Sequence, residues 1–294
     1  MAWLELSLIV AAEQQAGVEA ALEELGALAV TLLDAEDHPI FEPAPGETPL
    51  WPQIAMSALF EAASDRAGLV HVLTELVPEL GPERISFRHV EDQDWTRAWM
   101  DRFQPMRFGR RLRIYPWNIE PPGDAGAVVV RLDPGLAFGT GTHPTTALCL
   151  EWLDAQDLAG RQVVDYGCGS GVLAIAALKL GAARVVGVDN DPQALTASRD
   201  NAERNRVGND LALATPDAFV PFEADVLVAN ILAGPLEELA PLFARCVKAG
   251  GAIALSGILR GQETALVARY AEWFDAIAVE AREDWMRIGA RRRD

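Results

Sequence analysis

The second half of the chain alternates between short apolar runs and longer stretches in which apolar residues recur at helical spacing. This alternation starts near Thr145 and predicts a doubly wound α/β sheet that is largely parallel. In such a sheet the ligand lies at the carboxyl ends of the strands, near the point where the strand order reverses. The predicted strands cover residues 162–166, 184–189, 210–214, 224–229, 251–257, 274–281 and 285–290.

The first ninety residues form a different pattern, in the order β-α-β-β-α-β. This order is typical of a small α+β, ferredoxin-like domain, which we place at residues 1–90. A Pro- and Gly-rich loop at 38–52 separates its two halves. Strands are predicted at 3–10, 27–33, 54–60 and 85–90, and helices at 13–25 and 66–80.

Residues 91–105 are rich in Trp and charged residues and predict a helical linker between the two domains. Trp95 and Trp99 are one helical turn apart, so we expect them to pack the domains together rather than to form a hinge. The second domain then covers residues 106–294 and begins with strands at 112–115 and 127–132.

A glycine-rich segment, Val163-Val-Asp-Tyr-Gly-Cys-Gly-Ser-Gly-Val172, joins a predicted strand to a predicted helix. Gly167, Gly169 and Gly171 lack side chains where a ligand would have to touch the backbone. The next strand ends in Asp189, about where nucleoside-binding βαβ units place a carboxylate for ribose hydroxyls. The segment therefore indicates a nucleoside ligand, although an ordinary α/β turn without a ligand is the simpler alternative.

The glycine spacing helps to choose the ligand. It reads G-x-G-x-G, whereas a dinucleotide fingerprint requires G-x-G-x-x-G. Asp165 precedes the turn, and its carboxylate would repel a pyrophosphate. S-adenosylmethionine carries an ammonium, a sulfonium and a ribose, so it suits both Asp165 and Asp189.

The segment Asp225-Val-Leu-Val-Ala-Asn230 predicts a buried strand that ends in an amide. An Asn side chain both donates and accepts hydrogen bonds, so Asn230 is a candidate to position the cofactor or the attacking amine. Its alternative role is a turn residue without ligand contact. Asp165, Asp189 and Asn230 all fall at predicted strand ends, and we expect them to share one crevice.

Residues 132–146 read Leu-Asp-Pro-Gly-Leu-Ala-Phe-Gly-Thr-Gly-Thr-His-Pro-Thr-Thr. Pro144 favours the first turn of a helix, and the free N–H groups there suit a carboxylate such as that of a methionine moiety. Thr145 and Thr146 lie in this turn, and Phe138 is a candidate to cover the site and exclude water. His143 is a candidate base, but a structural role is the more common one for a histidine in such a loop.

Together, residues 132–146, 163–171 and 225–232 resemble the bacterial ribosomal protein L-11 methyltransferases, and the resemblance extends over essentially the whole chain. It implies a class I methyltransferase (Rossmann-like) fold and trimethylation of lysine side chains and the N-terminal α-amine of one large-subunit ribosomal protein. It also implies that the N-terminal domain recognises that protein, and that Thr145, Gly167, Asp189 and Asn230 contact the cofactor. Families that methylate glutamine or adenine have Asn-Pro-Pro-Tyr where this chain has Asn230-Ile-Leu-Ala.

Composition limits the remaining possibilities. The formal net charge of −18 argues against direct nucleic-acid binding and favours a cationic partner. No apolar run is long enough to span a membrane, and we find no signal peptide. The three cysteines lack metal-ligand spacing, so we expect no metal and a reducing, cytoplasmic setting. The oligomeric state is left open.

The leading interpretation is a protein-lysine methyltransferase. Three alternatives are also open: an NAD-dependent oxidoreductase, a methyltransferase with another protein or small-molecule substrate, and a binding module. Because no Asp/His pair lies near the motifs, no catalytic base is assigned. We expect the substrate amine to lose its proton to water, with Asn230, Phe138 and Thr146 as candidates to position it.

Overall fold

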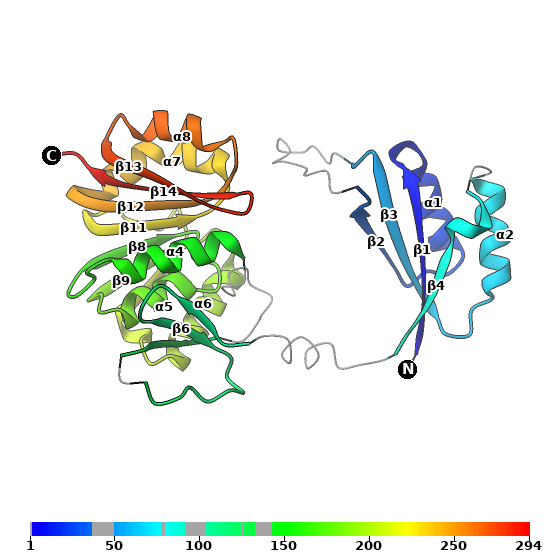
Figure 1. The fold of residues 1–294 in the computed structure, drawn as a ribbon, viewed down its shortest axis with the longest axis horizontal. Coiled ribbons are helices and arrows are strands. Elements are labelled where there is room, and N and C mark those ends of the chain that lie inside the picture. The colour runs from blue at the N-terminus through cyan, green and yellow to red at the C-terminus, as the bar shows by residue number, and fades with distance from the viewer. Residues whose placement is uncertain (1, 37–49, 78–79, 92–103, 125, 133–142) are drawn as a thin grey trace. The chain divides into compact units, whose positions relative to one another are not determined.

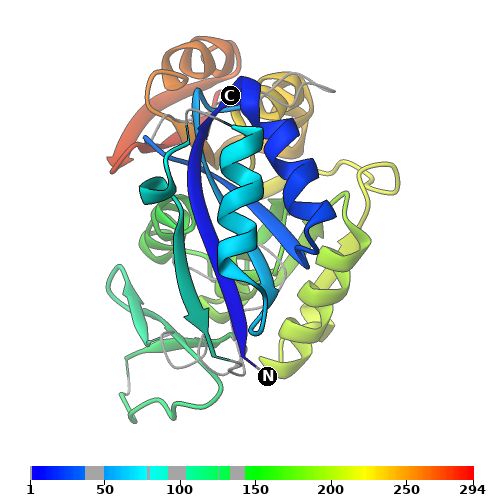
Figure 2. The ribbon, with the colours of Figure 1, turned by 90° about the vertical axis from the view of Figure 1, so that its right-hand side faces the viewer.

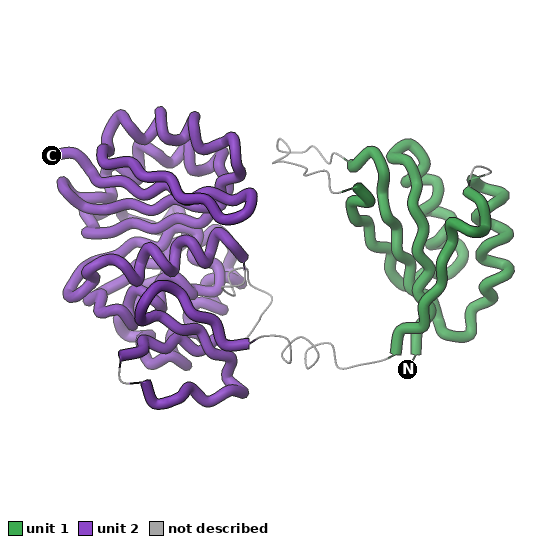
Figure 3. Tube along the Cα trace, viewed as in Figure 1, with its two compact units in different colours: residues 1–95 green, residues 96–294 purple. Residues whose placement is uncertain are grey.

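The computed structural model describes residues 2–36, 50–77, 80–91, 104–124, 126–132 and 143–294. The chain divides into two compact units, residues 1–95 and residues 96–294 (Figure 3). Most of the predicted linker, including Trp95 and Trp99, lies outside the described residues.

The first unit is a four-stranded antiparallel sheet with the strand order β2-β3-β1-β4. This is the order of a ferredoxin-like sandwich, and both helices lie over one face of the sheet (Figure 2). Its elements are β1 (Trp3–Ala11), α1 (Ala12–Glu24), β2 (Ala29–Asp34), β3 (Gln53–Glu61), α2 (Arg66–Leu76), the short 3-10 helix η1 (Pro82–Arg84) and β4 (Ser86–Val90).

Side chains of this sheet alternate between a buried face and a more exposed one. Leu4, Leu6 and Leu8 of β1 are buried against the helices, together with Val18 and Leu22 of α1. The predicted second helix extends to Leu80, but α2 ends at Leu76. The reason is Pro78, because a residue that precedes proline avoids the helical conformation.

The second unit is built around a seven-stranded sheet with the order β10-β9-β8-β11-β12-β14-β13 (Figure 1). The first five strands are parallel, and β14 runs antiparallel to both of its neighbours. The predicted doubly wound sheet is confirmed. The strands are β8 (Gln162–Tyr166), β9 (Arg184–Val188), β10 (Leu211–Ala214), β11 (Ala224–Asn230), β12 (Val247–Leu259), β13 (Phe274–Arg282) and β14 (Trp285–Arg292).

Both faces of this sheet are covered, so its central strands are apolar on both sides. On β8, for example, Val163 belongs to one buried cluster and Val164 to the other. The helix that follows the glycine turn is buried almost all round, from Val172 to Leu178. The remaining helices are α4 (Pro144–Ala155), α5 (Val172–Lys179), α6 (Pro192–Arg204), the 3-10 helix η2 (Gly208–Asp210), α7 (Ala233–Cys246) and α8 (Glu263–Tyr270).

The strand order reverses between β8 and β11. From β8 the chain builds β9 and β10 on one side, then crosses to β11 on the other side. The carboxyl ends of β8 and β11 therefore flank the topological switch point, where ligands of open α/β sheets bind. Asp165 lies near the end of β8 and Gly167 directly follows that strand, and Asn230 lies at the end of β11.

A separate small sheet consists of β5 (Met106–Phe108), β6 (Leu112–Tyr115) and β7 (Val128–Arg131). The first of these strands was not predicted. The buried carboxylate of Asp154, on α4, accepts backbone N–H groups from Arg110, Arg111 and Leu112. This carboxylate fixes the turn that joins β5 to β6.

No helix in the described part of the chain is both long and apolar enough to cross a bilayer. The three cysteines are reduced and buried.

Candidate active site

The glycine turn after β8 has an unusual backbone. Gly167, Gly169 and Gly171 adopt φ angles of 79°, 52° and 78°, in the region that disfavours residues with a Cβ. A Cβ on Gly167 would in addition overlap the side chain of Ile231. These positions require glycine because of local geometry and close packing.

Helix α6 holds the same turn from a second side. The Ser198 hydroxyl donates to the carbonyl of Gly169 at 2.8 Å, and the Asn201 amide donates to the carbonyl of Ser170 at 2.9 Å. Ser198 is fully buried. Neither residue was predicted, since nothing in the sequence pattern of α6 distinguishes Ser198 and Asn201 from ordinary helix positions.

Asp189 connects the end of β9 to the glycine turn. Its Oδ2 accepts the backbone N–H of Gly169 at 2.8 Å, and its Oδ1 accepts that of Asp191 at 3.0 Å. The side chain is half-buried. Each carboxylate oxygen can accept a further hydrogen bond, so Asp189 can receive the two hydroxyls of a ribose.

Asp165 is completely buried. Its Oδ2 accepts the N–H of Ala174 in the first turn of α5 at 2.9 Å, and its Oδ1 has no partner. Burial, with a smaller contribution from the charge of Asp189, raises the pKa of Asp165 to about 7. A cation near Oδ1 would stabilise the ionised form.

The end of β11 is linked to the start of α4. The Asn230 amide donates to the Thr146 hydroxyl at 3.3 Å. Thr145 and Thr146 are both buried. Ile231, which follows Asn230, lies against Gly167, so this second group of predicted residues adjoins the glycine turn.

His143 begins helix α4 as its N-cap residue. Its Nδ1 lies 2.7 Å from the Thr145 hydroxyl and 3.4 Å from the Thr145 backbone nitrogen. The ring also packs edge-on against Trp285, with centroids 4.7 Å apart. Burial lowers the pKa of His143, and the nearby charge of Glu283 partly opposes this effect. These contacts give His143 a structural role.

Of the predicted site residues, Asp165, Gly167, Gly169, Gly171 and Asp189 gather around the glycine turn. Asn230, Thr145 and Thr146 form the adjoining group. Phe138 lies outside the described residues.

Trp285 was also missed. It begins β14 and pairs with Leu259 at the carboxyl end of β12, so the antiparallel strand brings it to the candidate site. Its sequence signal would have been a bulky aromatic directly after the acidic turn formed by Glu283 and Asp284.

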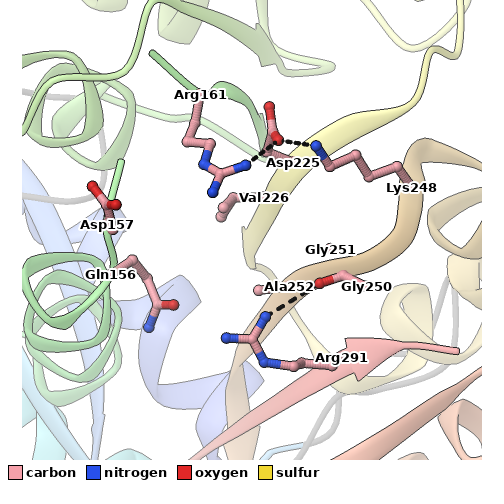
Figure 4. A pocket seen from close by; sticks show the side chains of 10 residues that line it. All are labelled: Gln156, Asp157, Arg161, Asp225, Val226, Lys248, Gly250, Gly251, Ala252 and Arg291. Atoms are coloured by element: carbon pink, nitrogen blue, oxygen red, sulfur yellow. Dashed lines mark hydrogen bonds and ion pairs between the residues drawn. The ribbon is translucent and has the colours of Figure 1, made fainter. Parts of the chain in front are cut away.

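A hollow with a volume of about 140 Å³ lies at the opposite end of the sheet, at the amino-terminal ends of β8, β11 and β12 (Figure 4). Asp225 pairs there with Arg161 at 3.0 Å and with Lys248. Burial would raise the pKa of Asp225, but hydrogen bonds from Lys248, Gln162 and Arg161 lower it to about 2. In this hollow the charge of Asp225 is thus already balanced by neighbouring cations, so its carboxylate has little need of a ligand.

Chemistry that depends on a protein-bound metal or a reactive thiol has no support in the described residues. No group of three His, Cys, Asp or Glu side chains is placed there to hold a metal. Burial raises the pKa of Cys168, in the glycine turn, to about 12, so its thiolate is not populated near neutral pH.

Comparison with known proteins agrees with this geometry. A family model described as ribosomal protein L11 methyltransferase (PrmA) matches residues 2–293. The ribosomal protein L11 methyltransferases of Pseudomonas aeruginosa (strain LESB58) and Stenotrophomonas maltophilia (strain K279a) are each 56% identical to this chain and align with all of it, over 99% and 100% of their own lengths. A crystal structure of the ribosomal protein L11 methylase from Lactobacillus delbrueckii subsp. bulgaricus is 32% identical, with a TM-score of 0.59. The match covers 65% of this chain and 99% of the Lactobacillus chain.

Proposed function

The chain belongs to the ribosomal protein L11 methyltransferase family, and from this premise we propose that it methylates lysine side chains and the N-terminal α-amine of ribosomal protein L11. S-adenosylmethionine is the methyl donor of this reaction. The observation that carries the proposal is the glycine turn, with the carboxylates of Asp165 and Asp189 beside it, in a chain that matches the family from end to end.

The residues present fit S-adenosylmethionine. In our proposal Asp189 accepts the ribose hydroxyls, and the N–H groups of the first turn of α4 hold the carboxylate of the amino-acid end. The unpartnered Oδ1 of Asp165 suits a positively charged ligand, and a diphosphate would place its own negative charge near this carboxyl group. When bound, S-adenosylmethionine supplies an electrophilic methyl group on a sulfonium.

The task of the protein is to align the substrate amine with this methyl group. Held beside Asp165, Asp189 and the first turn of α4, S-adenosylmethionine would supply the methyl group, and the neutral amine would supply the lone pair. A product ammonium that is to receive another methyl would first release a proton to water. Asn230 donates to Thr146 and carries a carbonyl oxygen that can accept an amine N–H.

The proton of the incoming amine is also lost to water in this proposal. The reference pKa is about 10.4 for a lysine amine and about 7.7 for an α-amine. Near neutral pH the lysine amine is therefore almost fully protonated, and the α-amine is protonated to a smaller extent. Desolvation at the site lowers these values. His143 already caps α4 through Nδ1, which supports its exclusion as the base.

We further propose that residues 1–90 recognise the protein substrate and that the enzyme acts in the cytoplasm, where ribosomal proteins are made. Free, buried cysteines are compatible with a reducing compartment.

The test is incubation of the protein with isotope-labelled S-adenosylmethionine and purified L11, followed by mass spectrometry of L11. We expect added methyl groups on lysine side chains and on the N-terminal amine. Transfer to a different ribosomal protein would reassign the substrate. Calorimetry that detects binding of NAD, but not of S-adenosylmethionine, would favour the oxidoreductase.

A further inference from the structure

The hairpin of β5 and β6 is unusually rich in arginine. Four arginines fall within residues 107–113, at positions 107, 110, 111 and 113, in a chain whose formal net charge is −18. One of them, Arg111, pairs with the buried carboxylate of Asp154 at 3.4 Å. The positive charge of the other three is not explained by this ion pair.

Arg107 and Arg113 lie directly opposite each other on the antiparallel strands β5 and β6. Residues in such opposite positions project from the same face of a sheet. The alternate pair, Phe108 and Leu112, is buried in the core, so the two arginines are on the outer face. Like charges in directly opposite positions destabilise an antiparallel pair of strands.

The two guanidinium groups converge on one backbone oxygen. Nη2 of Arg107 and Nη1 of Arg113 each donate to the carbonyl of Arg110, both at 3.4 Å. Bonds to the carbonyls of Gly109 and Leu112, at 3.2 and 3.3 Å, also hold the two side chains in this arrangement. Two positive charges are therefore fixed beside each other at the turn.

Little negative charge offsets this pair in the described part of the chain. Nη2 of Arg113 is 3.9 Å from Oδ2 of Asp124, which is longer than a hydrogen bond, and the Asp124 side chain is 56% exposed. No carboxylate of a described residue forms an ion pair with Arg107 or with the exposed side chain of Arg110. Neighbouring like charges repel each other, and an anion bound between them would relieve the repulsion.

Arg107 and Arg113 also have donors available for such an anion. A guanidinium group has five N–H donors, and the bonds to backbone carbonyls use two on each side chain. The remaining donors of each group can bind two oxygens of one anion. Arginine favours this two-pronged geometry with carboxylate and phosphate groups.

We propose that Arg107 and Arg113, with Arg110 beside them, form a binding site for a small phosphate-type oxyanion such as inorganic phosphate. A nucleic acid offers the same chemical group, but its many charges are repelled by a protein of net charge −18. A small anion responds mainly to the local field of the arginines, because salt screens more distant charges.

This site is separate from the candidate active site, so the inference goes beyond the proposed function and does not depend on it. The hairpin turn is bound to Asp154 near the end of α4, whereas Thr145 and Thr146 lie in the first turn of that helix. With a rise of about 1.5 Å per residue, Asp154 and Thr145 are separated by roughly 13 Å along the helix axis.

The test follows the thermal unfolding of the full-length protein during a titration with sodium phosphate. Sodium chloride keeps the ionic strength constant, so that general screening does not change. A ligand that binds only the folded state raises the Tm, and at ten times its dissociation constant we expect an increase of about 3–6 °C. No increase in the unaltered protein would overturn the proposal.

Two double variants with the same change in net charge locate the effect. Arg107→Gln with Arg113→Gln removes the charges of the proposed site. Arg184→Gln with Arg199→Gln removes two exposed arginines, on β9 and α6, and is the matched control. The phosphate concentration for half of the Tm increase should rise at least about tenfold in the first variant and less than about twofold in the control. Equal responses would refute the assignment to the hairpin.

The single variant Arg107→Gln keeps the test decisive if the double variant does not fold. Arg107 is exposed, and its replacement removes the repulsion with Arg113. In chloride this variant should be at least as stable as the unaltered protein, but most of its response to phosphate should be lost. A variant that is less stable in chloride and still responds fully to phosphate would contradict the proposal.

Fluorescence anisotropy with a short labelled single-stranded RNA distinguishes the two sources of phosphate. Absence of RNA binding, under conditions in which phosphate raises the Tm, supports a small ligand. RNA that binds, is displaced by phosphate and is lost in Arg107→Gln with Arg113→Gln would reassign the site to a nucleic-acid backbone. None of these measurements uses methyl transfer, so a failure of the proposed function would leave their outcome unchanged.

Discussion

The carboxylate of Asp189 and the backbone N–H of Gly169 are joined by a 2.8 Å hydrogen bond that links the ends of two parallel strands. This bond fixes the acid at the mouth of the glycine turn before any ligand arrives. A carboxylate that is already held in place loses little conformational entropy when it accepts ribose hydroxyls.

Replacement of Asp189 by Ala should therefore weaken the binding of S-adenosylmethionine by about 1–3 kcal/mol, because charge-assisted hydrogen bonds are lost. Isothermal titration calorimetry measures the change. Asp191→Ala is the matched control, since Asp191 caps α6 through the N–H of Gln193. It should reduce stability but leave the affinity nearly unchanged. Equal losses of affinity in the two variants would rule out a contact between Asp189 and the ribose.

The affinity for S-adenosylmethionine should depend on pH through Asp165, whose pKa of about 7 lies above its ordinary value. The proton on Asp165 must leave before its charge can attract a cationic ligand, so affinity should rise roughly fivefold from pH 6 to pH 7. Asp165→Asn should bind more weakly and abolish this dependence. An identical pH dependence in the variant would show that another group titrates.

The same raised pKa affects the stability of the fold. The folded protein keeps a proton on Asp165 that the unfolded chain has lost between about pH 4 and pH 7. Asp165 contributes its full stabilisation below the pKa that it has in the unfolded chain, and this contribution falls as pH rises from about 4 to about 7. The free energy of unfolding should therefore fall less over this pH range in Asp165→Asn than in the unaltered protein. Denaturant unfolding of both proteins measures the difference.

Asp225 should give the opposite trend. Its pKa of about 2 lies below the unfolded value, so it stabilises the fold above about pH 4, and the effect is lost as pH falls towards 2. Asp225→Asn removes the ion pairs with Arg161 and Lys248, so it should lower the free energy of unfolding at pH 7. The loss should be only about 1 kcal/mol, because the two cations are 44% and 42% exposed and solvent screens the pairs. Chemical denaturation at pH 7 and pH 3 measures it. A loss that is equal at both values would exclude the ion pairs as its source.

Gly257 lies at a close approach of the chain beside the candidate site. Its φ is +86°, and a Cβ there would overlap the backbone of Ile231, next to Asn230. Gly257→Ala should destabilise the protein by about 3 kcal/mol and reduce kcat, since strain and overpacking add. Gly261→Ala has a similar φ of +98° but open space around the Cβ, so it should cost only about 1–2 kcal/mol and leave kcat intact. Thermal unfolding and initial rates distinguish the two. Equal effects would mean that backbone conformation alone is responsible.

The rate of methyl transfer should climb with pH towards alkaline values, since the neutral amine is the nucleophile. His143→Asn should keep this shape, because Asn also caps a helix. If His143 were the base, the variant would lose activity by about 100-fold or more and the pH profile would change its slope. Single-turnover rates measured across the pH range decide between the two.

The sequence predicted the residues whose position depends on local pattern and strand direction. Asp189 and Asn230 could be placed because parallel strands end at one edge of a sheet, and the glycine turn could be placed because its spacing is distinctive. Which face of β8 carries Asp165 could not be predicted, since its neighbours are apolar on both faces.

Other contacts depend on pairings that no local pattern encodes. Trp285 reaches His143 because β14 inserts antiparallel between β12 and β13. Ser198 reaches Gly169 across 29 residues, through the packing of α6 beside the turn. Asp165, Asp189 and Asn230 were therefore predictable, whereas the side chains that hold the glycine turn in place were not.

The bonds from Asp154 to the turn between β5 and β6 set a practical boundary for excising the methyl-transfer unit. A fragment that started at the motif around His143 would lack β5, β6 and β7. It would expose Leu150 and Leu153 of α4, which are fully buried in one cluster with Leu112 of β6. It would also leave the carboxylate of Asp154 without its three backbone donors. A self-sufficient catalytic fragment must therefore begin upstream of Met106, well ahead of the described residues that contact the glycine turn, such as Asp189, Ser198 and Asn201.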